Sequence, residues 1–340
     1  MTMKSGFLRI ALAAAVSAAI SFVATGPAFA QAKPVTLKLA HGATADQAIG
    51  KAMQKFGELV EQKSGGAAKV EVHLAGSLYN ERTSLEAIVN GAVDFGGASN
   101  ANWAAFTRTL MFMDLPYVIN DEEAFKRVMH GRAGDDIRKR FEKDGFKLLM
   151  ILDNGGFRDI VNNKRPIRTP GDLKGLKFRT TASPVEIAMF RNWGAIPTAI
   201  DWAEVYNALG SGVVDGEFVM PTWLATAKHY EVLKYATRNR AAIGVQTLAM
   251  RKDRFEKLPA NLQSAILASA KEAEAYGNEL DASMSEKARA YAKSLGVVTY
   301  EPTEQEMQQW RTTGRAVWKE FDGKIDKDLL KLVLDAQSKG

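Results

Sequence analysis

Two stretches of the sequence switch repeatedly between the two-residue hydrophobic period of a β-strand and the longer period of an α-helix. In the first stretch, Val35, Leu37 and Leu39 alternate with polar residues, and apolar residues then recur at helical spacing over 49–60. The same order of strand and helix continues over 70–95. A strand that is followed by a helix usually leads into a parallel neighbouring strand, so this pattern predicts a mostly parallel sheet with helices on both faces.

The second stretch repeats this order in the middle of the chain. We predict strands at 176–180, 196–200 and 213–216, separated by two helices. The segment Ser183-Pro184-Val185-Glu186 reads as a helix start, with an N-cap serine, a proline at the first helical position and a glutamate that can return a hydrogen bond to the cap. The sequence therefore predicts two α/β units of similar wiring.

The length of the chain also favours two lobes, because a single hydrophobic core rarely grows beyond about 250–300 residues. We expect the first lobe to comprise 31–155 plus about 244–282, and the second to comprise 156–243 plus about 283–340. From Pro259 to about Leu295 the chain has no further proline and a single glycine, Gly277. This composition predicts one very long helix, or two joined end to end, which could reach across both lobes.

The N-terminus has the pattern of a secretory signal peptide. A short basic region with Lys4 and Arg9 precedes an apolar stretch at 10–23, and small residues stand at Ala28 and Ala30. We expect cleavage after Ala30, which gives residues 1–30 as signal peptide and a periplasmic location. The alternative is an uncleaved membrane anchor, although the apolar stretch is short for a bilayer.

Composition excludes several classes of function. The chain has no cysteine, so disulfides, thiolate metal sites and a cysteine nucleophile are excluded. Loss of the signal peptide removes two basic residues and lowers the formal charge from +6 to +4. Basic and acidic residues are interspersed, which argues against a nucleic-acid surface and weakly favours anionic ligands.

The sequence offers little for catalysis. Its four histidines are not at metal-ligand spacing, and it has no nucleophile-elbow serine, phosphate-binding glycine loop or dinucleotide fingerprint. Carboxylate pairs such as Glu122-Glu123 lie in a charged helical stretch typical of a solvated surface. We therefore expect a binding protein without catalytic residues, metal or cofactor.

An ordered series of short motifs carries a resemblance to a known family. The motifs are Gly156-Phe157-Arg158, Asn163-Lys164-Arg165-Pro166-Ile167, Asp172-Leu173-Lys174-Gly175-Leu176-Lys177-Phe178-Arg179, Ser183-Pro184, Gly194-Ala195-Ile196-Pro197, Glu204-Val205-Tyr206-Asn207-Ala208-Leu209 and Val213-Val214-Asp215-Gly216. In order and spacing the chain resembles the solute receptors of tripartite ATP-independent periplasmic (TRAP) transporters. The resemblance extends from Leu37 to the last helices, and it implies an α/β, two-lobe periplasmic binding protein (type II-like).

The resemblance also implies two arginines in the ligand site. Arg179 ends a predicted strand, at the edge of the sheet where ligands of α/β proteins bind, and the family has a carboxylate-clamping arginine at this position. A guanidinium suits that task because it donates two parallel hydrogen bonds. Arg158 matches a second arginine of the family. The alternatives are a surface salt bridge for Arg179 and an ion pair between strands or lobes for Arg158.

Aromatic and apolar residues accompany these arginines. The resemblance places Trp202 in the pocket lining, although it could instead pack on a helix start. The family commonly reads Gln-Glu-Asn-Pro where this chain has Glu217-Phe218-Val219-Met220. Val219 thus replaces an asparagine that would suit a hydroxyl-rich ligand. With Phe218 and Trp223 nearby, we hypothesise an aromatic or hydrophobic carboxylate, while core packing could equally explain Phe218 and Met220.

Three residues of the first lobe are further candidates for the site. His41 follows the opening strand where the ligand-contacting loop of the family begins, and Asn100 follows the third strand. Both could instead be turn or helix-cap residues. Trp103 is a third candidate.

From these residues we expect a receptor that closes on a small-molecule carboxylate and delivers it to the small and large subunits of a TRAP membrane permease. We expect a monomer that binds no nucleic acid. The alternatives are an ABC-type solute-binding protein or a sensor accessory receptor for a small anion, and, further from the pattern, an enzyme.

Overall fold

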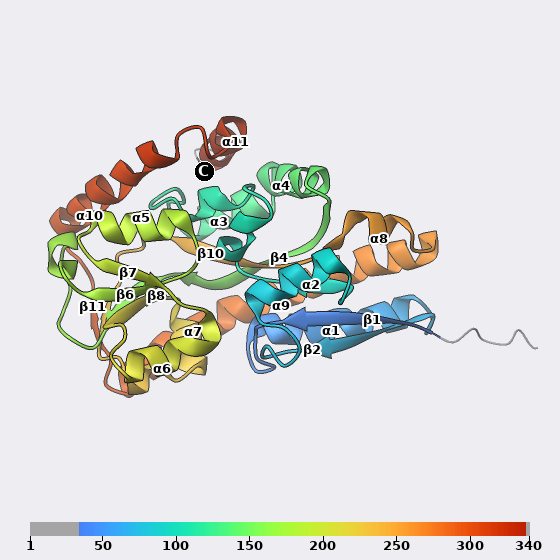
Figure 1. Cartoon of the computed structure of the whole chain (residues 1–340), viewed down its shortest axis with the longest axis horizontal. Helices are drawn as coiled ribbons and strands as arrows, with labels where there is room; N and C mark the ends of the chain where they lie inside the picture. Colours follow the sequence, from blue (N-terminus) through green and yellow to red (C-terminus); the bar gives the residue numbers. More distant parts are fainter. Residues whose placement is uncertain (1–33, 338–340) are drawn as a thin grey trace, which may run out of the picture. The chain divides into compact units, whose positions relative to one another are not determined.

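The computed structural model describes residues 34–337, apart from the side chains at positions 286 and 289, and it contains two β-sheets (Figure 1). In the first sheet the three strands nearest one edge run parallel, and the fourth runs antiparallel to both of its neighbours. Its order is β2 (Ala68–His73), β1 (Val35–His41), β3 (Phe95–Gly97), β10 (Ile243–Arg251) and β4 (Phe146–Phe157). The predicted signal peptide lies outside the described residues.

The second sheet combines parallel and antiparallel pairs. Its order is β11 (Val298–Tyr300), β9 (Tyr235–Thr237), β5 (Asp159–Asn162), β8 (Gly216–Val219), β6 (Lys177–Thr180) and β7 (Ile196–Ala199). The central strand β5 is antiparallel to β8 and to β9, whereas β6 is parallel to β8 and β7. The α/β architecture with two sheets is confirmed, but the sheets are mixed where the sequence pattern predicted mostly parallel ones.

The antiparallel strands are those that pass from one sheet to the other. Strand β4 belongs to the first sheet and β5 to the second, and Arg158 alone separates them. The chain returns from β9 to β10 through residues 238–242. The backbone N–H of Arg158 donates to the carbonyl of Ala242 at 3.0 Å, so the two crossings are bonded to each other. No crossover helix joins these strands to their neighbours in the sheet. The expectation that a strand followed by a helix leads into a parallel strand therefore does not apply to them.

Two glycines precede the first crossing. Gly155 and Gly156 have φ angles of +79° and +80°, a left-handed conformation that residues with a Cβ rarely adopt. A Cβ on Gly155 would also lie 2.1 Å from Oγ1 of Thr222. Any side chain at position 155 would therefore distort the end of β4.

Helices cover both sheets, and the caps explain where several of them begin. Asn80 and Thr83 form a reciprocal capping box at the start of α2. The hydroxyl of Ser183 accepts the Glu186 N–H at 3.3 Å, as predicted, but the Glu186 carboxylate does not return to the cap. The α-helices are α1 (Ala48–Lys63), α2 (Glu81–Asn90), α3 (Glu122–Met129), α4 (Arg132–Lys143), α5 (Pro184–Asn192), α6 (Val205–Gly210), α7 (Pro221–Thr226), α8 (Lys252–Glu256), α9 (Ala260–Ser294), α10 (Glu304–Ala316) and α11 (Lys327–Gln337).

The helix α9 confirms the prediction of one very long helix, and it closes an edge of the first sheet. It packs on α1 and β4 and also on α7, so it contacts elements beside both sheets. Strand β4 is the last strand of its sheet, and every second N–H of an edge strand lacks a partner strand. In this structure three side chains of α9 accept these N–H groups. The pairs are Glu274 with Ile151 at 2.6 Å, Asn278 with Asp153 at 2.9 Å, and Asp281 with Gly155 at 2.9 Å.

This set of three pairs, which we call the α9–β4 ladder, follows from the two periodicities. Residues 274, 278 and 281 lie on one face of a helix, and residues 151, 153 and 155 point their N–H groups to one edge of a strand. Two strand residues span about 6.7 Å, and the helical steps from 274 to 278 and from 278 to 281 span about 6 Å and about 4.5 Å, so successive side chains stay within reach of successive N–H groups.

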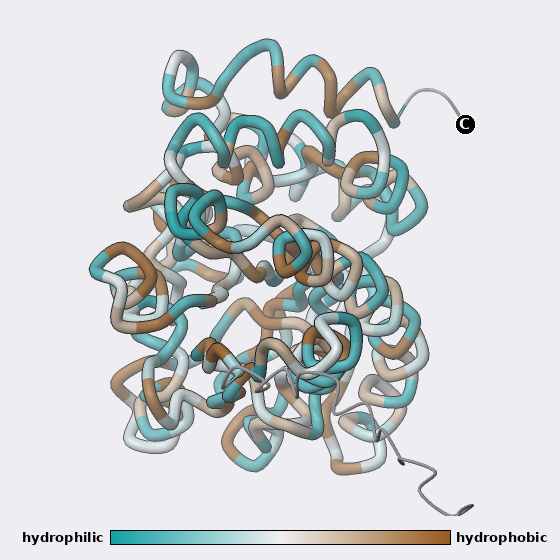
Figure 2. The backbone as a smooth tube through the Cα atoms, turned by 90° about the vertical axis from the view of Figure 1, so that its right-hand side faces the viewer, coloured by the Kyte–Doolittle hydropathy of each residue, from teal (hydrophilic) through white to brown (hydrophobic). Residues whose placement is uncertain are grey.

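The apolar faces of the helices pack on the sheets. Figure 2 shows hydrophilic and hydrophobic stretches alternating along single helical coils, as expected for helices with one buried face. Trp103 lies in the core beside Phe141 and Phe146 and donates its indole N–H to Thr247 at 2.7 Å. It is fully buried and does not face the cavity described below. Among the described residues no helix combines the length and the hydrophobicity needed to cross a membrane.

Candidate functional site

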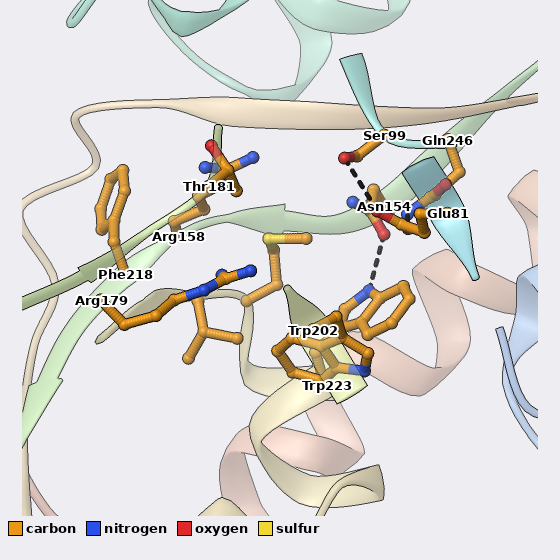
Figure 3. Close-up of a pocket in the computed structure, with 12 residues that line it drawn as sticks. Glu81, Ser99, Asn154, Arg158, Arg179, Thr181, Trp202, Phe218, Trp223 and Gln246 are labelled. Carbon is orange, nitrogen blue, oxygen red and sulfur yellow. Dashed lines mark hydrogen bonds between the residues drawn. The ribbon is translucent and has the colours of Figure 1, made fainter. Parts of the chain in front are cut away.

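A cavity of about 40 Å³ lies between residues contributed by both sheets (Figure 3). Its walls combine two arginines, two tryptophans and a group of polar side chains. The lining residues are Glu81, Ser99, Asn154, Arg158, Arg179, Thr181, Trp202, Phe218, Val219, Met220, Trp223 and Gln246. Six residues that the sequence predicted for the site therefore meet at one place: Arg158, Arg179, Trp202, Phe218, Val219 and Trp223.

Arg179 contributes a buried positive charge to this cavity. It lies on β6, its side chain is 6 % exposed, and its Nε donates to the carbonyl of Ile200 at 3.0 Å. Among the described side chains no carboxylate oxygen lies within 4.0 Å of its guanidinium. Burial lowers the pKa of Arg179, although the carboxylates of Glu186 and Glu217 oppose this shift. A guanidinium remains protonated in proteins, so the cavity holds a cation without a direct counter-ion.

Arg158 is placed differently, because its charge already has a partner. Its Nη1 lies 2.8 Å from Oε2 of Glu186, and both side chains are almost fully buried. The Glu186 carboxylate also accepts the hydroxyl of Thr181 at 2.5 Å. The Arg158 guanidinium lies 5.6 Å from the centre of the Phe218 ring. Arg158 thus forms an ion pair, although its partner lies on helix α5 and not on a strand, and Arg158 lines the cavity as well.

Two tryptophans form an aromatic wall next to Arg179. Trp202 and Trp223 pack edge to face with ring centres 5.0 Å apart, and the Arg179 guanidinium lies 5.8 Å from the Trp202 ring centre. The indole N–H of Trp223 donates to Oδ1 of Asn154 at 2.6 Å. Behind Trp202 lies His229, whose Nδ1 is 2.6 Å from a buried carboxylate oxygen of Glu217. Both indoles are thus fixed by contacts that lie outside the cavity or on its rim.

The segment that departs from the family pattern supplies apolar side chains. Phe218, Val219 and Met220 all line the cavity. Phe218 also packs against Phe190, with ring centres 5.7 Å apart, so it belongs to the core as well as to the cavity wall. Core packing is therefore present at Phe218, and its contact with a ligand remains a prediction.

Five polar lining residues were not among the candidates from the sequence: Glu81, Ser99, Asn154, Thr181 and Gln246. Figure 3 shows Glu81, Ser99 and Gln246 together on the side opposite Phe218 and Arg179. Glu81 is the first residue of α2, and its position after the cap Asn80 was the signal that could have identified it as a fixed, partly buried carboxylate.

His41 and Asn100 do not line the cavity. His41 is fully buried, its Nδ1 accepts the Ala43 N–H at 3.0 Å, and burial lowers its pKa to about 4. It is therefore neutral at pH 7 and cannot pair with an anion there. The amide of Asn100 donates to Asp114 at 2.7 Å and accepts the Val245 N–H at 3.1 Å. Burial raises the pKa of Asp114 to about 6.

Comparison with known proteins assigns this architecture to a family. The family model described as bacterial extracellular solute-binding protein, family 7, matches residues 39–324. The chain belongs to this family. The C4-dicarboxylate-binding periplasmic protein of Rhodobacter capsulatus is 32 % identical over 318 residues, which is 93 % of this chain and 94 % of that protein. The 2,3-diketo-L-gulonate-binding periplasmic protein of Escherichia coli is 30 % identical over 72 % of this chain and 75 % of its own length.

Solved structures of family 7 proteins have the same fold. A TRAP periplasmic solute-binding protein from Shewanella oneidensis with bound succinate has a TM-score of 0.85 at 28 % identity, covering 89 % of this chain and 99 % of that one. The sugar acid binding protein of Advenella mimigardefordensis, in complex with galactonate, has a TM-score of 0.86 at 26 % identity, covering 90 % of this chain and 99 % of its own. The chain is thus a TRAP-type solute-binding protein, and this assignment favours the TRAP class over the ABC-type and sensor alternatives.

Family 7 is a family of receptors and not of enzymes. In the part of the chain that the structure describes, no group of three or more histidine, aspartate or glutamate residues is arranged to hold a metal ion. The site therefore offers a cation, hydrogen-bond donors and aromatic surface, which are the elements of anion binding.

Proposed function

We propose that this protein is a periplasmic receptor of a TRAP transporter that captures a small organic carboxylate at Arg179 and delivers it to the two membrane subunits of its permease. One observation carries the proposal: Arg179 is a buried cation without a carboxylate partner among the side chains that the structure describes. A buried charge without a counter-ion is costly, and an anionic ligand would supply the missing partner. A carboxylate matches the fork of the guanidinium.

Arg158 has a second role in this proposal. Glu186 already balances its charge, so Arg158 contributes hydrogen-bond donors to the ligand rather than net charge. Its Nε is buried without a hydrogen-bond partner among the described residues. A ligand oxygen within reach would satisfy such a group.

The cavity is too small for such a ligand unless the protein opens. A volume of about 40 Å³ holds about three water molecules, which is less than a carboxylic acid of several carbons needs. We propose that the two sheets move apart at the crossings on either side of Arg158, next to Gly155 and Gly156, and close again over the ligand. The lobe boundaries, 31–155 with about 244–282 and 156–243 with about 283–340, remain predictions.

The side chains along the cavity favour a ligand with an apolar part. Val219, Met220 and the two tryptophans provide surface but few hydrogen bonds, since the Trp223 N–H is used by Asn154. An aromatic or hydrophobic carboxylate would bury its apolar part there.

The test compares acids with their neutral analogues. Mature protein from residue 31 onward is titrated calorimetrically with phenylacetate, 4-hydroxyphenylacetate, butyrate and galactonate, each beside the corresponding amide. We expect at least one acid to bind and its amide to bind at least 100-fold more weakly, because the amide leaves Arg179 unpaired. An amide that binds as tightly as its acid contradicts the proposal.

A further inference from the structure

We propose that Glu81 restricts the ligand to acids that carry a single carboxylate and end in a neutral hydrogen-bond donor. This inference rests on the proposed function, because it assumes that the carboxylate of the ligand binds at Arg179. It concerns the opposite end of the same cavity, where Glu81 lies beside Ser99 and Gln246 (Figure 3).

Neutral donors hold the Glu81 carboxylate in place. Oε1 accepts the amide of Gln246 at 2.6 Å, and Oε2 accepts the amide of Asn102 at 2.7 Å and the hydroxyl of Ser99 at 3.1 Å. No described cationic side chain lies within 4.0 Å of this carboxylate. As the first residue of α2, Glu81 also lies at the positive end of a helix dipole. The surroundings thus stabilise a negative charge at this end of the cavity without neutralising it.

The charges around the cavity can balance one ligand carboxylate. Arg158 is paired with Glu186, and a ligand carboxylate would take the remaining cation, Arg179. A second carboxylate would have no cation of its own and would face Glu81. Like charges that approach in a partly buried site repel each other strongly.

A neutral hydrogen-bond donor at the far end of the ligand would not be repelled by Glu81. A ligand hydroxyl can donate to the Glu81 carboxylate, which has lone pairs beyond the three it already uses. The two tryptophans and Met220 lie along the cavity and suit an apolar middle. The preferred ligand is therefore a hydroxy monocarboxylic acid. The relatives named above bind dicarboxylates in two cases, a C4-dicarboxylate and succinate, and this chain would disfavour them.

Two length-matched series of acids test this inference by calorimetry at pH 7.5. The first is 4-hydroxybutyrate against succinate, and the second is 4-(hydroxymethyl)phenylacetate against 4-carboxyphenylacetate. We expect the hydroxy acid to bind at least tenfold more tightly than the diacid in whichever series binds. Glu81→Gln should shift this ratio toward the diacid by at least tenfold, because it removes the repelling charge.

Control variants separate the effect of the charge from damage to the fold. Glu86→Gln removes a charge from the exposed face of the same helix and should leave the ratio within threefold. Glu81→Asp keeps the charge and should also keep the preference for the hydroxy acid. Gln246→Lys would set an ammonium against Glu81 and should shift the ratio toward the diacid, so it provides a second route if Glu81→Gln does not fold, as judged by circular dichroism.

The outcomes distinguish this inference from the proposed function. A wild-type protein that binds the diacid as tightly as the hydroxy acid overturns the inference, as does an unchanged ratio in folded Glu81→Gln. In both cases the role of Arg179 stands, because acids still bind in preference to amides. If no acid binds, or if amides bind equally well, the proposed function itself fails.

Discussion

The two sides of strand β4 near its end differ in how completely their polar groups are paired. On one side, the α9–β4 ladder gives the N–H groups of Ile151, Asp153 and Gly155 an acceptor from α9. On the other side, the cavity contains Arg179, whose guanidinium has no carboxylate partner among the described side chains. The ladder is complete without a ligand and should contribute to stability. The cavity is incomplete and should contribute to binding.

The largest expected effect is a loss of ligand affinity at the cavity. Arg179→Gln should weaken carboxylate binding by about 3–5 kcal/mol, because the ligand anion would be buried without its partner. The free energy of unfolding should not fall, since the substitution removes an uncompensated buried charge. Calorimetry and urea unfolding measure the two quantities. As a control, Arg191→Gln removes an exposed arginine paired with Glu320 and should change neither by more than about 0.5 kcal/mol. If Arg179→Gln lowers the free energy of unfolding but not the ligand affinity, Arg179 stabilises the fold and does not bind the ligand.

The next largest effect is expected at the last pair of the ladder, where stability should depend on pH. Burial raises the pKa of Asp281 to about 7, whereas an unfolded aspartate has a pKa of about 3.9. Between these values the folded state binds more protons than the unfolded state, so stability falls as the pH rises toward 7.

Asp281→Asn keeps an acceptor for the Gly155 N–H but removes the charge. The free energy of unfolding of Asp281→Asn minus that of wild type should be about 2–3 kcal/mol higher at pH 8 than at pH 5. Urea unfolding across this range measures the difference. A constant difference between the two proteins at all pH values would show that the Asp281 carboxyl titrates normally.

A smaller loss of stability is expected at the first pair of the ladder. Glu274→Ala removes the acceptor of the Ile151 N–H and the ion pair with Arg138 at 2.7 Å, which should cost about 2 kcal/mol. Ligand affinity should change less than twofold. Glu272→Ala, on the same helix, removes only a surface pair with Lys63 and should cost less than about 0.5 kcal/mol. A larger change in affinity than in stability would mean that the ladder belongs to the binding machinery.

The smallest effect concerns His130, which lies between two acidic side chains beside the ladder. Its Nε2 is 3.4 Å from Asp153 and its Nδ1 is 3.8 Å from Glu274, and these two nearby carboxylates raise its pKa to about 9. The stabilisation is fully present below the unfolded pKa of about 6.5 and is lost as the pH rises through 9.

His130→Ala should therefore cost about 1–2 kcal/mol at pH 6 and almost nothing at pH 10. His73→Ala is the matched control, because His73 makes no ion pair with other described residues. A cost that is equal at both pH values would assign the role of His130 to packing rather than to charge.

Local sequence patterns predicted the elements of the fold better than their connections. The long helix followed from a segment without proline, and the cap at Ser183 followed from its motif. The ladder could not be predicted, because Glu274, Asn278 and Asp281 look like the solvated face of a helix until β4 is placed beside them. The same holds for the antiparallel strands, whose direction depends on where the chain crosses between sheets.

The site was predicted in part for a similar reason. Arg179, Arg158 and the apolar segment at 218–220 were found through a family pattern and a departure from it. Glu81 was missed, because its neighbours Ser99 and Gln246 are distant in sequence and meet it only in the folded chain. Glu186 was assigned to a helix cap, since nothing local indicates its pair with Arg158.

The edge-to-face pair of Trp202 and Trp223 gives this protein a built-in optical probe. Indole emission responds to nearby charge and to water, and these two rings lie within the same cavity as Arg179. Occupancy should therefore be readable from intrinsic fluorescence, with no dye attached. Replacing either ring by phenylalanine would reveal which one reports on the bound molecule.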